Sequence, residues 1–289
     1  MDGTRVVYVI SSDWQFQTYI SIHSLLASGS DVDRITVLMV GGGGAQLKHL
    51  KGPVEVRDVE PVDDDYFLIN KTRLADLDAN RLVFLDADTV VLAPLNSLWE
   101  GRSADVIARI ATSYERSDFP ESLWRRALSL VEAPPTPYFN TGVLVLQNGV
   151  QRELRGAWRA ACRTLWARYE PTTSYPALGR RFAEQMSFSA AVSRLELSHH
   201  EMDGNAEHAT GWSFPVQDVE PDDPPVIYHA NGPFVSQAAR LEQRGAVDFS
   251  SPTASGGAHP YFWRLQYRRY LRWCKDKARP LLDRFRSEE

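Results

Sequence analysis

Two aspartates, Asp86 and Asp88, directly follow an apolar run that ends at Leu85. Ionised carboxylates are costly to bury, so they need a cation or hydrogen-bond donors as partners. Residues two positions apart in an extended chain point to the same side, and ligands bind at the carboxyl edge of open α/β sheets. Oxygen ligands at this spacing suit Mg²⁺ or Mn²⁺, which can hold a diphosphate. The alternative without chemistry is a turn aspartate followed by a helix cap.

His229 ends a second apolar run much later in the chain, and a turn sequence, Ala-Asn-Gly-Pro, follows it. A histidine at the end of a strand is usually structural. Together with the two aspartates, however, it becomes a candidate third ligand. Imidazole suits Mn²⁺ better than Ca²⁺.

An Asp-x-Asp pair after an apolar strand also fits a phosphohydrolase of the haloacid dehalogenase type, in which the first aspartate is the nucleophile. That motif normally lies on the first strand, whereas earlier strands are expected before Asp86. No ordered set of Ser/Thr, Lys and paired acids follows it, although Asp222 and Asp223 are adjacent. The metal site is therefore the favoured interpretation.

Short apolar strands that alternate with amphipathic helices must position these residues. This alternation predicts an α/β fold with a mixed, mostly parallel sheet flanked by helices. The glycines at 41–44 lack the spacing of a phosphate-binding loop, so we interpret them as a flexible strand exit. The expected strands are 5–11, 35–40, 54–59, 81–86, 105–110, 142–146 and 226–229, and the expected helices are 19–27, 71–78, 121–131, 152–169 and 181–192.

The composition narrows the class of protein. The 289 residues carry a formal net charge of −5, which argues against a nucleic-acid partner. Cys162 and Cys274 are far apart and in no metal-ligand spacing, which fits a reducing compartment. No signal-peptide pattern and no apolar run of ~18 residues is found. We expect a cytoplasmic protein with one catalytic domain over residues 1–250.

Four segments form a linked set in the sequence. They are Ser11-Ser-Asp13, the stretch from Arg73 through Phe84-Leu-Asp-Ala-Asp-Thr-Val-Val91 to Leu95-Asn-Ser-Leu-Trp99, Tyr138-Phe-Asn-Thr-Gly-Val, and His229-Ala-Asn-Gly-Pro. In this order they resemble family 8 of the glycosyltransferases, the GT-A-fold group that includes glycogenin and bacterial lipopolysaccharide galactosyl- and glucosyltransferases. The resemblance covers roughly residues 5–235.

The resemblance implies a GT-A (Rossmann-like) fold and a metal-dependent, retaining enzyme. Such an enzyme would move a hexose from a nucleotide-sugar, UDP-glucose or UDP-galactose, to an acceptor, with Mn²⁺ or Mg²⁺ as cofactor. Asp13 would contact the nucleobase, and Arg73 the nucleotide or the donor sugar. The resemblance implies cofactor binding by Ser11, Asp13, Arg73, Asp86 and Gly232, metal binding by Asp86, Asp88 and His229, and catalysis by Asn140, Glu184 and Gln185.

Two positions depart from the family pattern. Val235 stands where the family has a lysine for the diphosphate, and Arg240 is a candidate substitute. Glu184 stands where the family has aspartate. Because of the missing lysine, a non-catalytic nucleotide-sugar-binding protein is a second alternative.

The C-terminal part differs in composition from the domain before it. Residues 260–286 hold nine Lys/Arg against two Asp, and aromatic residues recur there at helical spacing. We expect an amphipathic basic helix over 258–289, which either packs on the catalytic domain or lies on an anionic membrane surface. The acceptor, a glycan, a lipid-linked sugar or a small molecule, is expected near the irregular segments 198–225 and 114–124.

Overall fold

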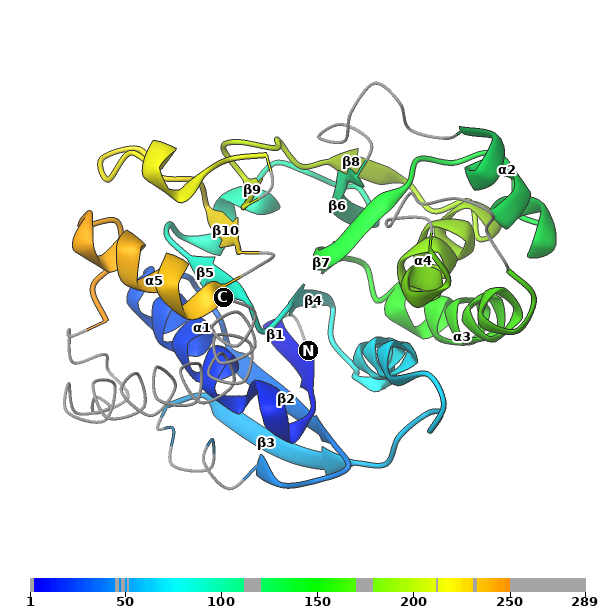
Figure 1. Ribbon diagram of the computed structural model, residues 1–289, viewed down its shortest axis with the longest axis horizontal. Helices are drawn as coiled ribbons and strands as arrows, with labels where there is room; N and C mark the ends of the chain where they lie inside the picture. The colour runs from blue at the N-terminus through cyan, green and yellow to red at the C-terminus, as the bar shows by residue number, and fades with distance from the viewer. Residues whose placement is uncertain are drawn as a thin grey trace, which may run out of the picture.

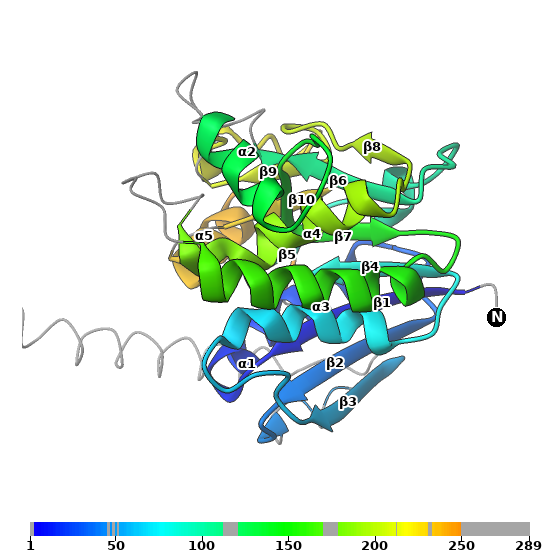
Figure 2. The same ribbon diagram turned by 90° about the vertical axis from the view of Figure 1, so that its right-hand side faces the viewer.

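The computed structural model describes residues 3–44, 47, 50, 52–111, 121–169, 179–211, 213–230 and 233–249. Its largest element is a seven-stranded sheet (Figures 1 and 2) with the order β3-β2-β1-β4-β7-β6-β8. Neighbouring strands are parallel except around β7, which runs antiparallel to β4 and β6. The predicted mixed, mostly parallel sheet is confirmed. The strands are β1 Thr4–Ile10, β2 Arg34–Val40, β3 Val54–Val59, β4 Arg81–Leu85, β6 Val106–Ile110, β7 Phe139–Leu146 and β8 His199–Glu201.

A second sheet of three short strands stands apart from the first. It consists of β5 Thr89–Val91, β10 Ile227–His229 and β9 His208–Thr210, in the order β5-β10-β9. The strand at 226–229 was expected, but its place in a separate sheet was not. The segment 198–225 is also more regular than predicted, because β8, β9 and the 3-10 helix η8 (Val216–Asp218) lie within it.

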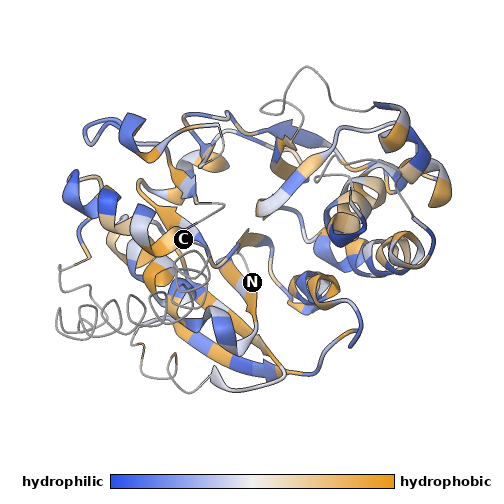
Figure 3. Ribbon diagram, in the orientation of Figure 1, coloured by the Kyte–Doolittle hydropathy of each residue, from blue (hydrophilic) through white to orange (hydrophobic). Residues whose placement is uncertain are grey.

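The helices cover both faces of the large sheet, as expected. Val6 and Tyr8 of β1 pack in one core with Ile22 of α1 (Gln15–Ala27). Val7 points to the opposite face and packs in a second core with Trp158 of α3 (Gln151–Arg168), beside α4 (Ala183–Arg194). Figure 3 shows hydrophobic colour along β1 and its neighbours, as expected for strands buried on both faces. The remaining helices are α2 Glu121–Leu130 and α5 Phe234–Gln243, the latter not predicted.

The helix expected at 71–78 is instead a 3-10 helix, η3, over Phe67–Asp76. Local hydrogen bonds favour this tighter turn: the Asn70 side chain donates to the carbonyl of Phe67, and the Thr72 hydroxyl donates to that of Ile69. Each bond spans three residues, which matches the three-residue period of a 3-10 helix.

Within the described part of the chain, no helix combines the length and the apolar character needed to cross a membrane. Two predictions fall elsewhere: Gly232 and the amphipathic tail at 258–289 lie outside the described residues. The same is true of most of the segment 114–124, of which only the end enters α2.

Candidate active site

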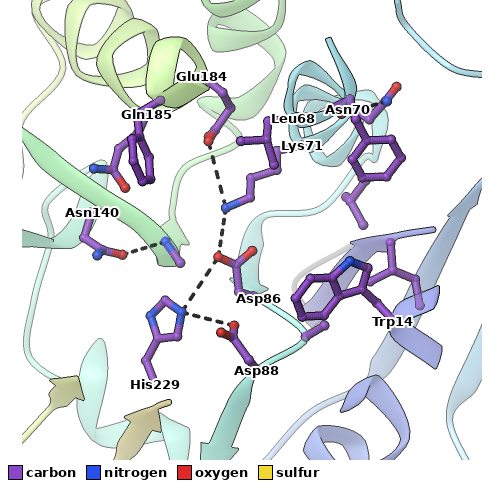
Figure 4. A pocket seen from close by; sticks show the side chains of 16 residues that line it. Trp14, Leu68, Asn70, Lys71, Asp86, Asp88, Asn140, Glu184, Gln185 and His229 are labelled. Carbon is purple, nitrogen blue, oxygen red and sulfur yellow. Dashed lines mark hydrogen bonds and ion pairs between the residues drawn. The ribbon is translucent and has the colours of Figure 1, made fainter. Parts of the chain in front are cut away.

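A cavity of about 280 Å³ lies at the carboxyl ends of β1 and β4, next to the start of β7 (Figure 4). Ile10 of β1, Asp86 after β4 and Asn140 of β7 contribute to its wall, and Lys71 of η3 and Glu184 of α4 contribute from the helical side. This is the edge at which open α/β folds bind ligands.

The three predicted metal ligands converge in this cavity. Nε2 of His229 lies 3.2 Å from Oδ1 of Asp88 and 3.9 Å from Oδ2 of Asp86. One ligand atom from each residue lies within 4.8 Å of those of the other two. Two carboxylates and an imidazole are a donor set that suits Mn²⁺. Residues Asp86, Asp88 and His229 therefore fit a divalent cation in both spacing and chemistry.

Backbone pairing brings these distant residues together. The strand β10 runs antiparallel to β5, with His229 opposite Thr89. The main-chain oxygen of Asp88 also accepts a hydrogen bond from the amide of Ala230, at 2.9 Å. The amide of Asp86, which follows β4, donates to the carbonyl of Gly142 in β7 at 2.8 Å.

The ionisable groups of the cluster shift one another's pKa values. Burial raises the pKa of Asp86, against the opposing effect of Lys71 and His229. At Asp88 burial acts in the same direction, but the charge and hydrogen bond of His229 outweigh it and lower the pKa. Burial disfavours a charged His229, yet the Asp88 carboxylate outweighs that effect and raises the pKa of the imidazole. A metal ion would replace the proton that His229 otherwise holds beside Asp88.

Gly142 leaves the space that His229 occupies. A Cβ atom at this position would lie 2.1 Å from Cε1 and 2.6 Å from Nδ1 of the His229 ring, closer than any real contact. The glycine of the Asn-Thr-Gly segment is therefore required by the metal site, since any side chain there would displace a candidate ligand.

Lys71 is the site residue that the sequence interpretation missed. Its Nζ donates to Oδ2 of Asp86 at 2.8 Å and lies 3.9 Å from Oε2 of Glu184, with the side chain only 15% exposed. Lys71 lies three residues before Leu74, which is fully buried, and residues three apart share a face in a 3-10 helix as in an α-helix. That spacing to a buried leucine is the signal that could have found it.

Arg73, the predicted donor-binding residue, does not line the cavity. Its guanidinium donates to Asp76 at 3.1 Å and to the main-chain oxygen of Glu60 at 2.6 Å. Along η3 the residues that line the cavity are Phe67, Leu68, Asn70 and Lys71, so Arg73 lies beyond the part of the helix that reaches it. The structure places Lys71 where the resemblance had placed an arginine.

The structure brings the three candidate catalytic residues together in the wall of the same cavity. Oδ1 of Asn140 accepts a hydrogen bond from the amide of Gly142 at 2.7 Å. Oε1 of Gln185 accepts one from the amide of Thr141 at 3.3 Å. Figure 4 shows Asn140 and Gln185 on the same side of the cavity, with Glu184 next to Lys71.

Glu184 is the most deeply buried acid of the cavity, 2% exposed. Tyr66 positions it, because its hydroxyl accepts a hydrogen bond from the amide of Glu184 at 2.9 Å. Oε2 of Glu184 accepts a hydrogen bond from the Thr141 hydroxyl at 3.2 Å, whereas Oε1 has no partner among the described residues. The free oxygen is an acceptor for a ligand hydroxyl. Burial raises the pKa of Glu184 to about 7, against the opposing charge of Lys71.

We expect this shift to appear as a pH-dependent difference in stability between the wild-type protein and Glu184→Gln. The pKa of Glu184 is higher in the folded protein than in the unfolded chain. Its contribution to the free energy of unfolding is therefore fully present below pH 4.5 and is lost as the pH rises through about 7. Relative to wild type, the glutamine variant should therefore gain about 2–3 kcal/mol in free energy of unfolding between pH 4 and pH 8. Urea unfolding of both proteins at each pH, without metal, measures this difference. Glu220→Gln, at an exposed site, is the control, and a pH-independent difference at position 184 would contradict the burial effect.

Two exposed aromatic side chains lie at the cavity. Trp14 and Phe67 line it and are 43% and 42% exposed. Each offers an apolar ring face to a planar or sugar ring. Ser11 and Asp13 stand beside Trp14 in the chain but do not line the cavity. The sequence interpretation did not single out either aromatic residue.

Helix α5 supplies no lysine or arginine to the cavity in place of the lysine that the family pattern has at position 235. Val235 is 1% exposed and packs in the core formed by α5 and the small sheet. Arg240 lies on an exposed position of the same helix and does not line the cavity. Among the described residues that line it, Lys71 is the only lysine or arginine.

Comparisons with known proteins agree with this geometry. Residues 65–156, which include η3, the two aspartates and Asn140, match the family model for glycosyl transferase family 8. A search of curated proteins found no match. The family match agrees with the enzyme class expected from the sequence, a glycosyltransferase, rather than with a phosphohydrolase.

The solved structures that are similar include the galactosyltransferase LgtC in complex with donor and acceptor sugar analogues. It is 16% identical, the match covers 84% of this chain and 100% of LgtC, and the TM-score is 0.57. An active-site mutant of LgtC, with a glutamine changed to glutamate, matches over the same shares with 16% identity and a TM-score of 0.56. The glycosyltransferase GlyE of Streptococcus pneumoniae is 16% identical, with 79% of this chain and 54% of GlyE covered and a TM-score of 0.50. These likenesses confirm the GT-A fold.

Proposed function

We propose that this protein is a divalent-metal-dependent glycosyltransferase that moves a hexose from UDP-glucose or UDP-galactose to an acceptor, with retention of configuration. The observation that carries the proposal is one cavity in which Asp86, Asp88 and His229 face Lys71 and Glu184. The glycosyl transferase family 8 match over residues 65–156 supports it independently.

Asp86, Asp88 and His229 would hold the metal, which suits both spacing and donor chemistry. When bound, the metal would neutralise the charge that develops on the leaving diphosphate. Lys71 holds the Asp86 carboxylate through a 2.8 Å hydrogen bond. This bond places a positive charge beside Asp86 in the cavity.

Glu184, Gln185 and Asn140 would form the wall beside the donor sugar. The unpartnered Oε1 of Glu184 can accept a hydrogen bond from a sugar hydroxyl. Gln185 is the candidate beside the anomeric carbon, because it lines the cavity with Asn140 and Glu184. Trp14, exposed at the cavity, would offer its ring face to the nucleobase.

The proposal extends to the acceptor and the location of the protein. A glycan, a lipid-linked sugar or a small molecule would be the acceptor, and the protein would act in the cytoplasm. The basic tail at 258–289 would contact an anionic membrane reversibly. Equal co-sedimentation with anionic and neutral liposomes at low salt would exclude that contact.

The deciding experiment is a calorimetric titration of UDP, UDP-glucose and UDP-galactose with and without Mn²⁺, followed by assays for sugar transfer and hydrolysis. Mn²⁺-dependent UDP binding with donor turnover is the expected result. Binding without turnover over any acceptor panel would point to a non-catalytic nucleotide-sugar-binding protein. Release of phosphate from simple monoesters without UDP binding would point to the phosphohydrolase.

A further inference from the structure

We propose that His208 is a positioning residue that selects the tautomer of His229 and thereby presents Nε2 of His229 to the metal. The inference rests on the metal site of the proposed function and adds a residue that neither the sequence motifs nor the cavity lining includes. His208 lies in β9, and its side chain is completely buried.

The two imidazoles meet through their nitrogen atoms. β9 and β10 are parallel neighbours, with His229 opposite Thr210 and His208 opposite Ile227. Nε2 of His208 lies 3.3 Å from Nδ1 of His229. The rings are nearly parallel, at 14°, while their centres are 5.5 Å apart. Because the nitrogens are far closer than the ring centres, the rings meet edge to edge, which is the geometry of an in-plane hydrogen bond.

The opposite edge of His229 faces the candidate metal site. Its Nε2 points to Asp88 and Asp86, so Nε2 is the atom available to a metal (Figure 4). A neutral imidazole has one nitrogen that donates and one that accepts. For Nε2 to offer its lone pair to a metal, Nδ1 must carry the proton and donate it to an acceptor. His208 Nε2 is positioned to be that acceptor.

Arg109 anchors the strand that carries His208. Its guanidinium, itself 2% exposed, donates to the main-chain oxygen of His208 at 2.5 Å. This bond fixes the backbone beside the imidazole, so that Nε2 of His208 stays next to Nδ1 of His229.

The contact with His229 is the polar interaction that the His208 ring makes within the described part of the chain. The Nδ1 edge of His229 is closed on its other side by Gly142, where even a methyl group would lie 2.6 Å away. Nδ1 of His208 has no hydrogen-bond partner among the described residues. A buried polar ring with one nitrogen unsatisfied costs stability, so an apolar side chain would serve the fold better.

The test compares His208→Gln with His208→Phe, using Mn²⁺ alone as the probe. Glutamine keeps an acceptor near the place of Nε2, and phenylalanine keeps the ring volume but removes the acceptor. We expect Mn²⁺ affinity, followed by electron paramagnetic resonance without nucleotide, to fall roughly 10- to 100-fold in His208→Phe. It should be largely retained in His208→Gln. Urea unfolding of both variants without metal separates this effect from a loss of packing.

The outcomes are separable. Unchanged Mn²⁺ affinity in His208→Phe, or equal losses in both variants, would overturn the positioning role while leaving the proposed metal site intact. Failure of the wild-type protein to bind Mn²⁺ would overturn both. If His208→Phe does not fold, nitrogen NMR of the histidine-labelled wild-type protein with diamagnetic Zn²⁺ decides. A proton on Nδ1 of His229 is expected there, and a proton on Nε2 would contradict the inference.

Discussion

Replacing Asp88 by alanine is expected to abolish the Mn²⁺-dependent part of UDP binding. The substitution removes one of three candidate ligands and also the carboxylate that lies 3.2 Å from Nε2 of His229. The main-chain oxygen of residue 88, which accepts a hydrogen bond from Ala230, is unaffected, so the connection between β5 and β10 remains. Since a bound cation contributes several kcal/mol of charge stabilisation, affinity for UDP with Mn²⁺ should fall by roughly 100-fold or more.

Calorimetric titration of UDP with and without Mn²⁺ measures the effect of Asp88→Ala. The matched control is Asp222→Ala, which removes an exposed aspartate outside the cavity and should leave UDP binding unchanged. Asp222 also belongs to the acidic pair that a phosphohydrolase would require. An Asp88→Ala protein with wild-type Mn²⁺-dependent affinity would show that Asp88 is not a metal ligand.

Lys71→Met and Arg73→Met form a matched pair with opposite expected results. Both substitutions remove a positive charge from η3 and keep an unbranched stem. Only Lys71 contacts Asp86 and approaches Glu184, whereas Arg73 is held by Asp76 and Glu60. Donor turnover should fall roughly 100- to 1,000-fold in Lys71→Met, because a fixed charge aimed into a buried site is lost. Arg73→Met should retain turnover, with at most a loss of stability.

Turnover of UDP-glucose and UDP-galactose at saturating Mn²⁺ measures both variants, and the affinity for Mn²⁺ alone is the internal check. Lys71→Met should bind Mn²⁺ at least as well as wild type, because a competing cation beside Asp86 is gone. A large turnover loss in Arg73→Met with little loss in Lys71→Met would restore the role that the sequence pattern assigned to Arg73. It would also mean that η3 rotates when the donor binds.

The two basic residues of η3 show where pattern matching from sequence is limited. The arginine of the sequence motif was matched by its neighbours in the chain. The cavity, however, is lined by the first part of η3, from Phe67 to Lys71. Which part of η3 reaches the cavity depends on its packing against residues distant in the chain, so Lys71 could not be distinguished from Arg73 beforehand.

Position 235 shows a second limit of interpretation from the sequence alone. The family resemblance predicts that a charge is missing at this position. It does not show that Val235 is buried in the core of α5 and the small sheet, nor that Arg240 lies outside the cavity. A substitute for the lost charge had to be sought by position in space, where Lys71 is the cation next to Asp86.

The sequence by itself determined the fold class and most of the chemistry of the site. Apolar runs buried on both faces predict a mostly parallel sheet, and polar residues at the ends of those runs must meet at one edge of it. Asp86, Asp88, His229, Asn140, Glu184 and Gln185 follow from that rule and from the family resemblance, and all of them line one cavity.

The tertiary structure alone decided how those groups are held and neutralised. The small sheet pairs β5 with β10 and β10 with β9, which sets His229 beside Asp88 on one side and beside His208 on the other. Gly142 leaves room for that ring, and η3 turns Lys71 rather than Arg73 toward the carboxylates. These contacts join residues that are distant in the chain, so their geometry depends on strand register and helix packing, which local sequence does not specify.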